Sequence, residues 1–542
     1  MFCPLDCWDV CELELKSSKF KATSFSSYLC YKLNNYFKFK RETNSFYKSK
    51  NIMLSDALEK LLLILKNTNP KKVLYIKGSG NLGIMQNVTK IFFEKYGAFF
   101  AVGSTCDGIG EEGIINSRGE SLILPTWVIK NAKNVLIWGR NIYTTNTHLL
   151  PLIKNKNILT IDVIKRKDSN FIQIKPNKDF YLAILLSQYV LEDRVKRDDG
   201  VNFDEFKKIV FSYSKKDLLD KCGIKEKEAK KLYEFIKDGA VVLLGLGVAK
   251  CKECYKTTWA IDSLFFMLDY FGKEDRGVSF LGSSNFGLNN PFDIEHKNTI
   301  NLFDIDLDDF EVVFIQGANP LASFNNRNIW EKLKQKTTIV FGKYMDESAK
   351  IATLFIPTKD FYQKKDIRGS YFYEYVFVNR KNKEVNNLIR EYELTSYLMK
   401  KFNFDGLKSE DEYIDIVLSA NLEQVDKDIY KKKVFSKAPY SEGFYTKDKK
   451  FHFLNEDFNY KDKEFEIVVA KHLTSLNSQF KRDDNIYINE NSKNIMLSFV
   501  YENFPKDKIK IDNKLPKNII YSTGRLINKI IKNRGKNAYY EI

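Results

Sequence analysis

Four of the chain's eight cysteines lie within its first thirty residues. Cys3, Cys7 and Cys11 follow one another at intervals of four, and Cys30 comes after a gap of eighteen residues. A close triplet with one distant thiolate suits a cubane iron–sulfur cluster, because a tight loop can bind three irons while a separate segment binds the fourth. Zinc is the nearest alternative, although zinc ribbons usually offer two close cysteine pairs. A disulfide would need an oxidising compartment, for which the sequence carries no signal.

The sequence around the other four cysteines is less specific for one kind of chemistry. Cys106 lies in the glycine-rich segment 103–113, where backbone N–H groups at the start of a helix would favour a thiolate. The alternative for Cys106 is a small buried residue that fills a turn. Cys251 and Cys254 have the spacing of a zinc or redox motif, but no second pair accompanies them. We therefore expect this pair and Cys222 to be structural.

Short apolar runs that end in polar or glycine-rich turns recur along the chain. Helical patterns follow several of them, including 84–96 and 259–271. Strands that alternate with helices predict parallel sheets with helices on both faces, which bind ligands at the carboxyl ends of the strands. We therefore assign the chain to the α/β class, with several domains of roughly 100–200 residues each. The predicted strands are 73–76, 134–138, 158–162, 171–174, 241–244 and 312–315.

The turn after the first of these strands contains Gly78, Gly80 and Gly83 at the spacing G-x-G-x-x-G. Such a turn lets backbone N–H groups at a helix N-terminus approach a phosphate closely. An NAD site also needs an acidic residue about 20 positions later, which binds the ribose. The segment 98–103 stands at that distance and contains no carboxylate, which counts against NAD.

The last part of the chain has a different pattern. Helical patterns cover 385–402 and 411–422. From about residue 465 the chain becomes a series of short strands, which predicts a small β-rich C-terminal domain. These strands are 467–470, 486–488, 508–511, 519–522 and 539–542.

The composition is that of a folded protein, with 44% hydrophobic and 14% aromatic residues. The net charge of +17 comes from lysines and arginines that are interleaved with 70 acidic residues, so we expect a solvated surface and no nucleic-acid partner. No apolar run reaches the roughly 18–20 residues of a membrane span. Because we find no leader segment, we expect a cytoplasmic protein.

Taken in order, these motifs resemble those of the molybdopterin oxidoreductases of the dimethyl-sulfoxide-reductase and formate-dehydrogenase type. The resemblance covers essentially the whole chain. The matching stretches are Cys3-Pro4-x-x-Cys7-x-x-x-Cys11 with residues 30–32, and then residues 138–141, 161–162, 175–179, 317–320, 346–357 and 471–478.

The resemblance implies a particular architecture. Two Rossmann-like domains would hold one molybdenum or tungsten between two pterin–guanine dinucleotides, with an N-terminal [4Fe–4S] domain and a C-terminal β-barrel over the pterins. We expect the iron–sulfur domain in 1–50, with about 360–385 as a candidate addition. The first pterin-dinucleotide domain would comprise 51–105, 286–359 and 386–440, the second 106–285, and the barrel 460–542.

The resemblance also implies roles for individual residues. Asp162 and Asp179 would accept hydrogen bonds from guanine or ribose. Lys32 would lie between the cluster and a pterin, on the electron path, and its alternative is an ordinary surface lysine. The bis-molybdopterin guanine dinucleotide would be bound by Gly78, Gly80, Gly83, Gly139, Asn141, Asp162, Pro176, Asp179, Gly317, Asn319, His472, Thr474 and Asn477.

In the same comparison Cys106 corresponds to the protein ligand of the metal. The stretch Cys-x-Gly followed by Gly113 resembles the family's ligand loop, and a soft thiolate suits molybdenum. Asp107 is the alternative ligand. Asp107 also stands where formate-oxidising members have a histidine, which counts against formate as the substrate. Ile142 replaces a usual proline, and the chain is compact for the family.

These inferences predict a cytoplasmic molybdenum or tungsten oxidoreductase that performs two-electron chemistry on a small-molecule substrate. One [4Fe–4S] cluster at Cys3, Cys7, Cys11 and Cys30 would relay electrons. Because one cluster cannot reach NAD or a quinone, we expect a ferredoxin-like or multi-cluster iron–sulfur partner subunit. The main alternative is a non-catalytic electron-wire or scaffold subunit of a respiratory complex that keeps the fold without the metal. An NAD-dependent dehydrogenase is a third reading.

Overall fold

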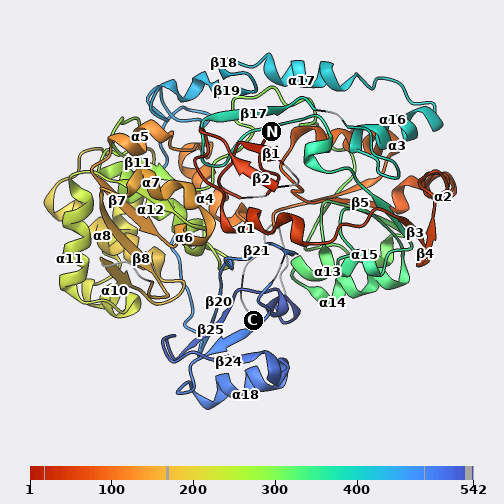
Figure 1. Cartoon of the computed structure of the whole chain (residues 1–542). Coiled ribbons are helices and arrows are strands. Elements are labelled where there is room, and N and C mark those ends of the chain that lie inside the picture. Colours follow the sequence, from red (N-terminus) through yellow and green to blue (C-terminus); the bar gives the residue numbers. More distant parts are fainter. Residues whose placement is uncertain are drawn as a thin grey trace.

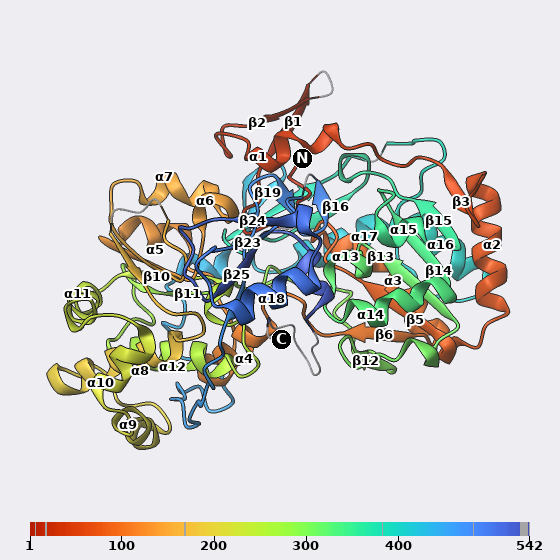
Figure 2. The ribbon, with the colours of Figure 1, turned by 90° about the horizontal axis from the view of Figure 1, so that it is seen from below.

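The computed structural model describes residues 1–5, 7–16, 19–166, 170–381, 383–480, 482–531 and 540. Two α/β units lie on either side of the N-terminal segment (Figure 1). Seen from below, the C-terminal unit lies between them (Figure 2). The prediction of a mixed α/β protein with several units is confirmed.

The first α/β unit contains one eight-stranded sheet. Its strands are β3 (Ser45–Tyr47), β4 (Lys50–Ile52), β5 (Val73–Lys77), β6 (Phe99–Val102), β12 (Thr299–Asn301), β13 (Val312–Gln316), β14 (Thr337–Gly342) and β15 (Leu354–Pro357). The order is β12-β6-β5-β13-β14-β15-β3-β4. Neighbours from β12 to β15 are parallel, whereas β3 and β4 join antiparallel at the edge.

Helices cover both faces of this sheet. They are α2 (Leu54–Lys66), α3 (Thr89–Tyr96), α13 (Pro320–Ser323), α14 (Arg327–Trp330), α15 (Glu347–Lys350) and α16 (Glu391–Lys401). Helix α17 (Glu410–Leu418) packs instead in a separate core with residues 84–88. Side chains of α2, α3 and α16 form one core with β5 and β13, and α13, α14 and α15 contribute to a core on the opposite face. Every residue of β13 is buried, as expected for a parallel strand that is covered on both sides.

The second α/β unit has a parallel sheet in the order β11-β10-β7-β8-β9. These strands are β7 (Asn134–Trp138), β8 (Asn157–Asp162), β9 (Phe171–Gln173), β10 (Val241–Leu244) and β11 (Gly277–Ser279). The helices are α4 (Gly108–Arg118), α5 (Thr126–Asn131), α6 (Ile142–Thr145), α7 (Leu150–Ile153), α8 (Asp179–Asp193), α9 (Phe203–Phe211), α10 (Lys215–Cys222), α11 (Glu226–Lys237) and α12 (Tyr255–Met267).

Helices α8 and α12 are apolar on nearly all sides because they lie inside the second unit. Two glycines let α4 pack closely on its neighbours, Gly113 on α12 and Gly110 on the residue that follows β11. A Cβ at Gly113 would lie 2.0 Å from the carbonyl oxygen of Tyr255, and one at Gly110 would lie 2.6 Å from the ring of Phe280. Part of the glycine content of segment 103–113 therefore serves helix packing.

The N-terminal segment packs on a small antiparallel sheet that is formed late in the chain. This segment contains β1 (Leu13–Lys16), β2 (Lys19–Ala22) and α1 (Tyr31–Asn34), and the sheet contains β16 (Asp366–Arg368), β17 (Tyr375–Asn379), β19 (Ile429–Lys432) and β18 (Leu422–Asp426), in that order. Phe2 and Val10 share a core with Phe377 and Ile429. The first cysteines are therefore supported by residues more than 350 positions away.

The C-terminal unit contains a four-stranded mixed sheet in the order β20-β25-β23-β24. Its elements are β20 (Glu466–Val469), β21 (Ser475–Leu476), β22 (Gln479–Phe480), β23 (Ile486–Ile488), α18 (Asn494–Asn503), β24 (Ile509–Ile511) and β25 (Ile519–Ser522). Four of the predicted strands are present; of the fifth, 539–542, residue 540 alone is among the described residues. The described part of this unit forms an open sheet with a helix and no closed barrel, so the predicted β-barrel is not found there.

Across the described ranges, no helix combines the length and the apolar character that crossing a membrane requires.

Candidate active site

A cavity of about 550 Å³ lies where the carboxyl ends of both parallel sheets meet. Its wall includes residues that follow β5, β6 and β13 in the first unit and β7, β8 and β10 in the second. Such a crevice is where open α/β sheets bind their ligands. The predicted residues in its wall are Cys7, Lys32, Gly78, Gly80, Cys106, Gly139, Asn141, Asp162, Pro176, Asp179, Gly317, Asn319, His472 and Asn477. Gly83 and Thr474 do not line it.

The glycine turns of the first sheet approach one another closely. A Cβ at Gly78 would lie 2.3 Å from the carbonyl oxygen of Gly317, and Gly317 itself has a φ of +59°. Glycine is therefore required for the two turns to share this edge of the sheet. Gly83 faces elsewhere, because its Cβ position lies 1.8 Å from the carboxylate of Asp366.

The second sheet repeats this arrangement. Gly139 has a φ of +61°, and a Cβ there would lie 2.8 Å from the side chain of Val248. Cβ atoms at Gly245 and Gly247 would meet the carbonyl oxygen of Gly139 at 2.1 and 2.6 Å. Both sheets therefore end in backbone that a flat, anionic ligand can approach without meeting side chains.

Two buried aspartates of the second unit lie in the wall. Asp162 ends β8 and accepts hydrogen bonds from Arg166 through Nε at 2.9 Å and Nη2 at 2.6 Å. Asp179 begins α8 and accepts a hydrogen bond of 2.7 Å from Nε1 of Trp138. Burial, aided by the charge of Asp162, raises the pKa of Asp179 to about 7. The two carboxylates therefore differ, because among the described residues Asp162 has an arginine partner and Asp179 has none.

Local hydrogen bonds fix three further residues that we predicted to bind the cofactor, Asn319, His472 and Thr474. Nδ2 of Asn319 donates to Oε2 of Glu347 at 2.8 Å, and its Oδ1 accepts from Oγ of Ser348 at 2.8 Å. In the C-terminal loop, Nδ1 of His472 lies 2.8 Å from Oγ1 of Thr474. These bonds fix the loops that form the cavity wall.

Cys106 lies just before helix α4, and its side chain is exposed in the wall of the cavity. The backbone N–H groups of Cys106, Asp107 and Gly108 all donate to Oγ of Ser104, at 3.1, 3.3 and 3.4 Å. Nζ of Lys250 donates to the carbonyl oxygen of Cys106 at 2.6 Å. The side chains of Ser104 and Lys250 therefore fix the backbone of this loop, and Cys106 lies in the cavity wall.

The four N-terminal cysteines gather in one place. Cys3 and Cys11 are buried in a core, and Cys7 and Cys30 pack against it. The charge of Cys3 acts on the pKa of Cys7, Cys11 and Cys30. Burial and the neighbouring thiols raise the pKa of Cys7 and of Cys30, the latter to about 11. The four thiols therefore lie together around one core.

The described residues include no group of three or more His, Cys, Asp or Glu side chains that is arranged around a single metal ion. A cubane cluster sets a different requirement, because each of its irons takes one cysteine and the ligands stand farther apart. Cys3, Cys7, Cys11 and Cys30 are of the residue type that such a cluster requires, and they lie around one core.

His148 contacts the cysteine loop, although we did not predict a functional position for it. Its Nε2 lies 3.5 Å from Sγ of Cys11 and 3.0 Å from the carbonyl oxygen of Tyr28, while its Nδ1 lies 3.0 Å from Oδ2 of Asp9. Burial lowers the pKa of His148, but the hydrogen bond and charge of Asp9 outweigh it and raise this pKa overall. The only available sequence signal was a histidine near the 138–141 motif.

Lys32 is buried between the cysteine loop and the cavity. This residue lies in helix α1, two positions after Cys30, and its Nζ donates a hydrogen bond to the carbonyl oxygen of Thr144. Burial lowers its pKa, and the charges of Cys30, Cys7 and Asp9 act in the opposite direction. The alternative of an ordinary surface lysine is excluded, because only 7% of the residue is exposed.

Arg140 joins the cysteine loop to the second unit. Its guanidinium lies 3.6 Å from the ring centroid of Trp8, a cation–π geometry, and its Nη2 donates to Oδ1 of Asn146 at 2.5 Å. Burial lowers the pKa of Arg140 to about 9. The 138–141 motif therefore lines the cavity and also packs against Trp8 of the cysteine loop.

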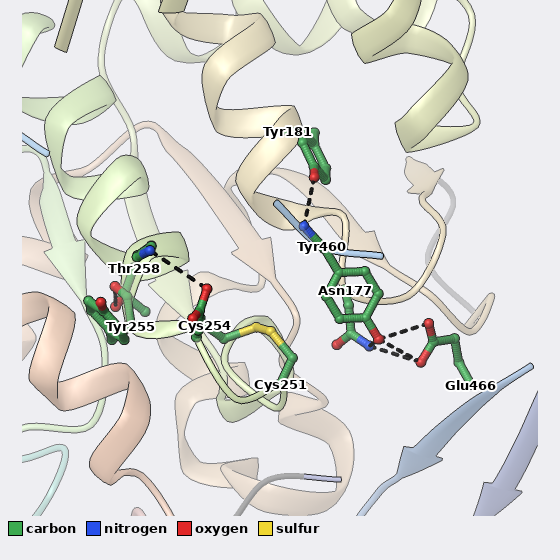
Figure 3. The surroundings of a disulfide bond; sticks show 10 residues. Asn177, Tyr181, Cys251, Cys254, Tyr255, Thr258, Tyr460 and Glu466 are labelled. Atoms are coloured by element: carbon green, nitrogen blue, oxygen red, sulfur yellow. Dashed lines mark hydrogen bonds and ion pairs between the residues drawn. A yellow bond between two sulfur atoms is a disulfide. The ribbon is translucent and has the colours of Figure 1, made fainter. Parts of the chain in front are cut away.

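Cys251 and Cys254 form a buried disulfide at the start of helix α12 (Figure 3). Cys222 is buried in the same core. A structural position for these three cysteines agrees with the prediction. Figure 3 also shows Asn177, whose Nδ2 donates to the hydroxyl oxygen of Tyr460 at 3.0 Å and to Oε2 of Glu466 at 3.1 Å.

The wall has an excess of positive charge. Nine lysines and arginines line the cavity, against five aspartates and glutamates. Lys77, beside the first glycine turn, has its pKa lowered to about 8 by burial and by the neighbouring Lys90. Glycine turns on two sheets together with a basic wall fit an anionic dinucleotide at each sheet.

The fold and the cavity are those of a dinucleotide-binding α/β protein, and comparison with known proteins shows its family. The family model described as molybdopterin oxidoreductase matches residues 55–374. The chain belongs to this family and is a molybdopterin-dependent oxidoreductase. The family implies a molybdopterin cofactor with molybdenum or tungsten.

Among its relatives is the protein named "Probable oxidoreductase YyaE" of Bacillus subtilis (strain 168). It is 25% identical over 475 residues, which cover 77% of this chain and 71% of the relative. Among solved structures, acetylene hydratase from Pelobacter acetylenicus matches with a TM-score of 0.70 and 11% identity, over 96% of this chain and 92% of that one. The latter match shows the shared fold alone.

Proposed function

We propose that this oxidoreductase binds a bis-molybdopterin guanine dinucleotide between its two sheets and a [4Fe–4S] cluster at Cys3, Cys7, Cys11 and Cys30. The observation that carries the proposal is the single cavity that joins Cys7, Lys32 and Cys106 to the glycine turns of both units. When bound, the metal–pterin group supplies two-electron redox chemistry on a small substrate, and the protein supplies its binding and its electrostatic surroundings.

Each unit would bind one dinucleotide. In the first unit, Gly78, Gly80, Gly317 and Asn319 form the surface for the cofactor. In the second unit, Gly139, Asn141, Pro176 and the two aspartates do so. Asp179, whose pKa is raised to about 7, can donate a hydrogen bond below that pH, whereas Asp162 is held by Arg166 as an acceptor. The loop with His472 and Asn477 would cover the pterins.

Cys106 would be the protein ligand of the metal. The support is its place in the wall and the backbone that holds it, since three N–H groups converge on Ser104 and Lys250 holds its carbonyl oxygen. The cation of Lys32 would lie on the path between the cluster and the cofactor. Electrons would pass to or from a ferredoxin-like partner, because the chain provides four clustered cysteines for one cluster.

Elemental analysis of anaerobically purified protein tests the proposal. One molybdenum or tungsten and four irons per chain support it. Iron without molybdenum or tungsten favours the electron-wire subunit instead. The absence of both overturns the proposal. Release of guanosine monophosphate on acid hydrolysis, at two per metal, would establish the dinucleotide form of the cofactor.

A further inference from the structure

Arg368, at the end of strand β16, is a buried cation beside the cysteine loop. It is 0% exposed, and its Nη1 donates to the carbonyl oxygen of Cys3 at 2.8 Å. Its Nε and Nη2 have no hydrogen-bond partner within the described residues. Leaving buried N–H groups of a charged side chain unpaired costs free energy, so a partner for them is expected.

The segment 366–370, which contains β16, is fixed to the cysteine loop at two points. Besides the bond from Arg368 to Cys3, Oγ of Ser370 donates to the carbonyl oxygen of Trp8 at 3.1 Å. These two acceptors stand on opposite sides of Cys7 in the chain. At its other end the segment contacts the residues that follow the first glycine turn, because Oδ1 of Asp366 accepts from the backbone N–H of Met85 at 3.0 Å. The guanidinium is therefore held rigidly against the loop.

The charge of Arg368 is buried. No carboxylate among the described side chains is hydrogen-bonded to Arg368. A buried charge without a counter-charge is strongly unfavourable, so an anion at the cysteines would compensate it.

We propose that Arg368 is a positioning residue for the iron–sulfur cluster, which it supports with a buried positive charge and with N–H donors directed to the cluster's sulfur atoms. This inference rests on the proposed function, because it requires a cluster at Cys3, Cys7, Cys11 and Cys30. Reduction adds one electron and so makes the cluster more negative by one charge. A fixed cation and hydrogen bonds to sulfur stabilise the reduced form more than the oxidised form, which raises the reduction potential.

The test compares the wild type with Arg368→Gln, Arg368→Lys and the control Arg197→Gln. Arg197 forms an ion pair with Asp199 outside the cysteine loop, so the control removes the same charge from another part of the protein. Each protein is purified anaerobically, its iron and labile sulfide are counted, and the cluster's electron paramagnetic resonance signal is followed during a redox titration.

We expect Arg368→Gln to lower the reduction equilibrium constant at least tenfold, which is about 59 mV for a one-electron couple. Arg368→Lys keeps the charge but loses the planar fork, so it should shift the potential in the same direction by less. The control should keep the wild-type value. Loss of iron from a folded Arg368→Gln protein also supports the positioning role.

Two results would overturn the inference, and they are distinguishable. A full cluster with the wild-type potential in both Arg368 variants shows that Arg368 does not act on the cluster, while the proposed function stands. Wild-type protein that holds no iron or sulfide removes the cluster itself and with it both proposals. If Arg368→Gln does not fold, Arg368→Lys decides: an unchanged potential contradicts the inference, and a lowered one supports it.

Discussion

Nε2 of His148 lies 3.5 Å from Sγ of Cys11, although 137 residues separate the two in the sequence. The histidine belongs to the second α/β unit, and the cysteine belongs to the N-terminal loop. Nδ1 of the same ring lies 3.0 Å from Oδ2 of Asp9, so the histidine contacts the loop at two residues. The cysteine loop is thus packed directly against the second unit.

Replacement of His148 by alanine should loosen the cysteine loop. The change removes the ring that contacts Cys11 and stacks on Tyr28, and it deprives the buried Asp9 of a partner. We expect a lower melting temperature, equivalent to about 1–3 kcal/mol, and faster loss of iron to a chelator. His452→Ala is the control, because that histidine pairs with Asp448 in a more exposed position. Equal behaviour of the two variants would contradict this prediction.

Replacement of Cys106 by alanine tests the metal ligand. The fold should survive, because the hydrogen bonds of this residue that hold the loop come from its backbone. We expect molybdenum or tungsten to remain bound by the pterins, with one sulfur fewer in the X-ray absorption spectrum at the metal edge. Replacement of Cys222, which is buried elsewhere, should not change that spectrum. A bound metal with an unchanged spectrum in Cys106→Ala would show that Cys106 is not the ligand.

The glycine turns allow a steric test of the cofactor site. In Gly78→Ala the new methyl group would lie 2.3 Å from the carbonyl oxygen of Gly317, so the two turns must separate. We expect a destabilisation of about 1–3 kcal/mol and a reduced pterin content, measured by the fluorescence of the released cofactor. Gly342→Ala is the matched control, because its nearest neighbours would be 3.5 Å away. Normal pterin content in Gly78→Ala would count against a cofactor role for this turn.

Asp179 predicts a pH dependence of stability. Burial raises its pKa to about 7, against about 3.9 in an unfolded chain. Between these values the folded state binds more protons than the unfolded state, so the stability that Asp179 contributes falls as the pH rises from about 4 to about 7. Each pKa unit corresponds to about 1.4 kcal/mol at most.

The variant Asp179→Asn removes this dependence while it keeps an oxygen that accepts from Trp138. The melting temperature of Asp179→Asn minus that of the wild type should therefore increase steadily between about pH 4 and pH 7. Above about pH 7 this difference should stay constant. Other buried carboxyls, such as Asp346, are common to both proteins and cancel in the comparison. A difference that does not change with pH would contradict the raised pKa.

Much of the framework could be predicted from local patterns. The apolar runs that we assigned to strands correspond to β5, β7, β8, β9, β10 and β13, because a strand buried on both faces has few polar residues. Their turns line one cavity because the carboxyl ends of parallel strands meet at the same edge of a sheet. The predicted barrel is absent from the described residues, since closure depends on strand pairing that no short pattern encodes.

Long-range contacts were outside the reach of the sequence. Arg368 and Cys3 are 365 positions apart, and no spacing rule links an arginine in a late strand to an N-terminal loop. Gly83 completed the G-x-G-x-x-G pattern, yet it serves the close approach of Asp366 and does not line the cavity. Gly113 was part of the pattern that resembles a ligand loop, but in the structure it allows helix α4 to pack closely on α12. The same residue types meet several needs, and only their neighbours in space distinguish them.

In the proposed function, one cavity would bring an iron–sulfur cluster and a metal–pterin centre close together, with Lys32 between them. Electron paramagnetic resonance of the partially reduced wild-type protein tests it most directly. We predict a signal of molybdenum or tungsten that broadens or splits when the cluster becomes paramagnetic. A metal signal that is unaffected by reduction of the cluster, or the absence of either signal at every potential, would contradict the account.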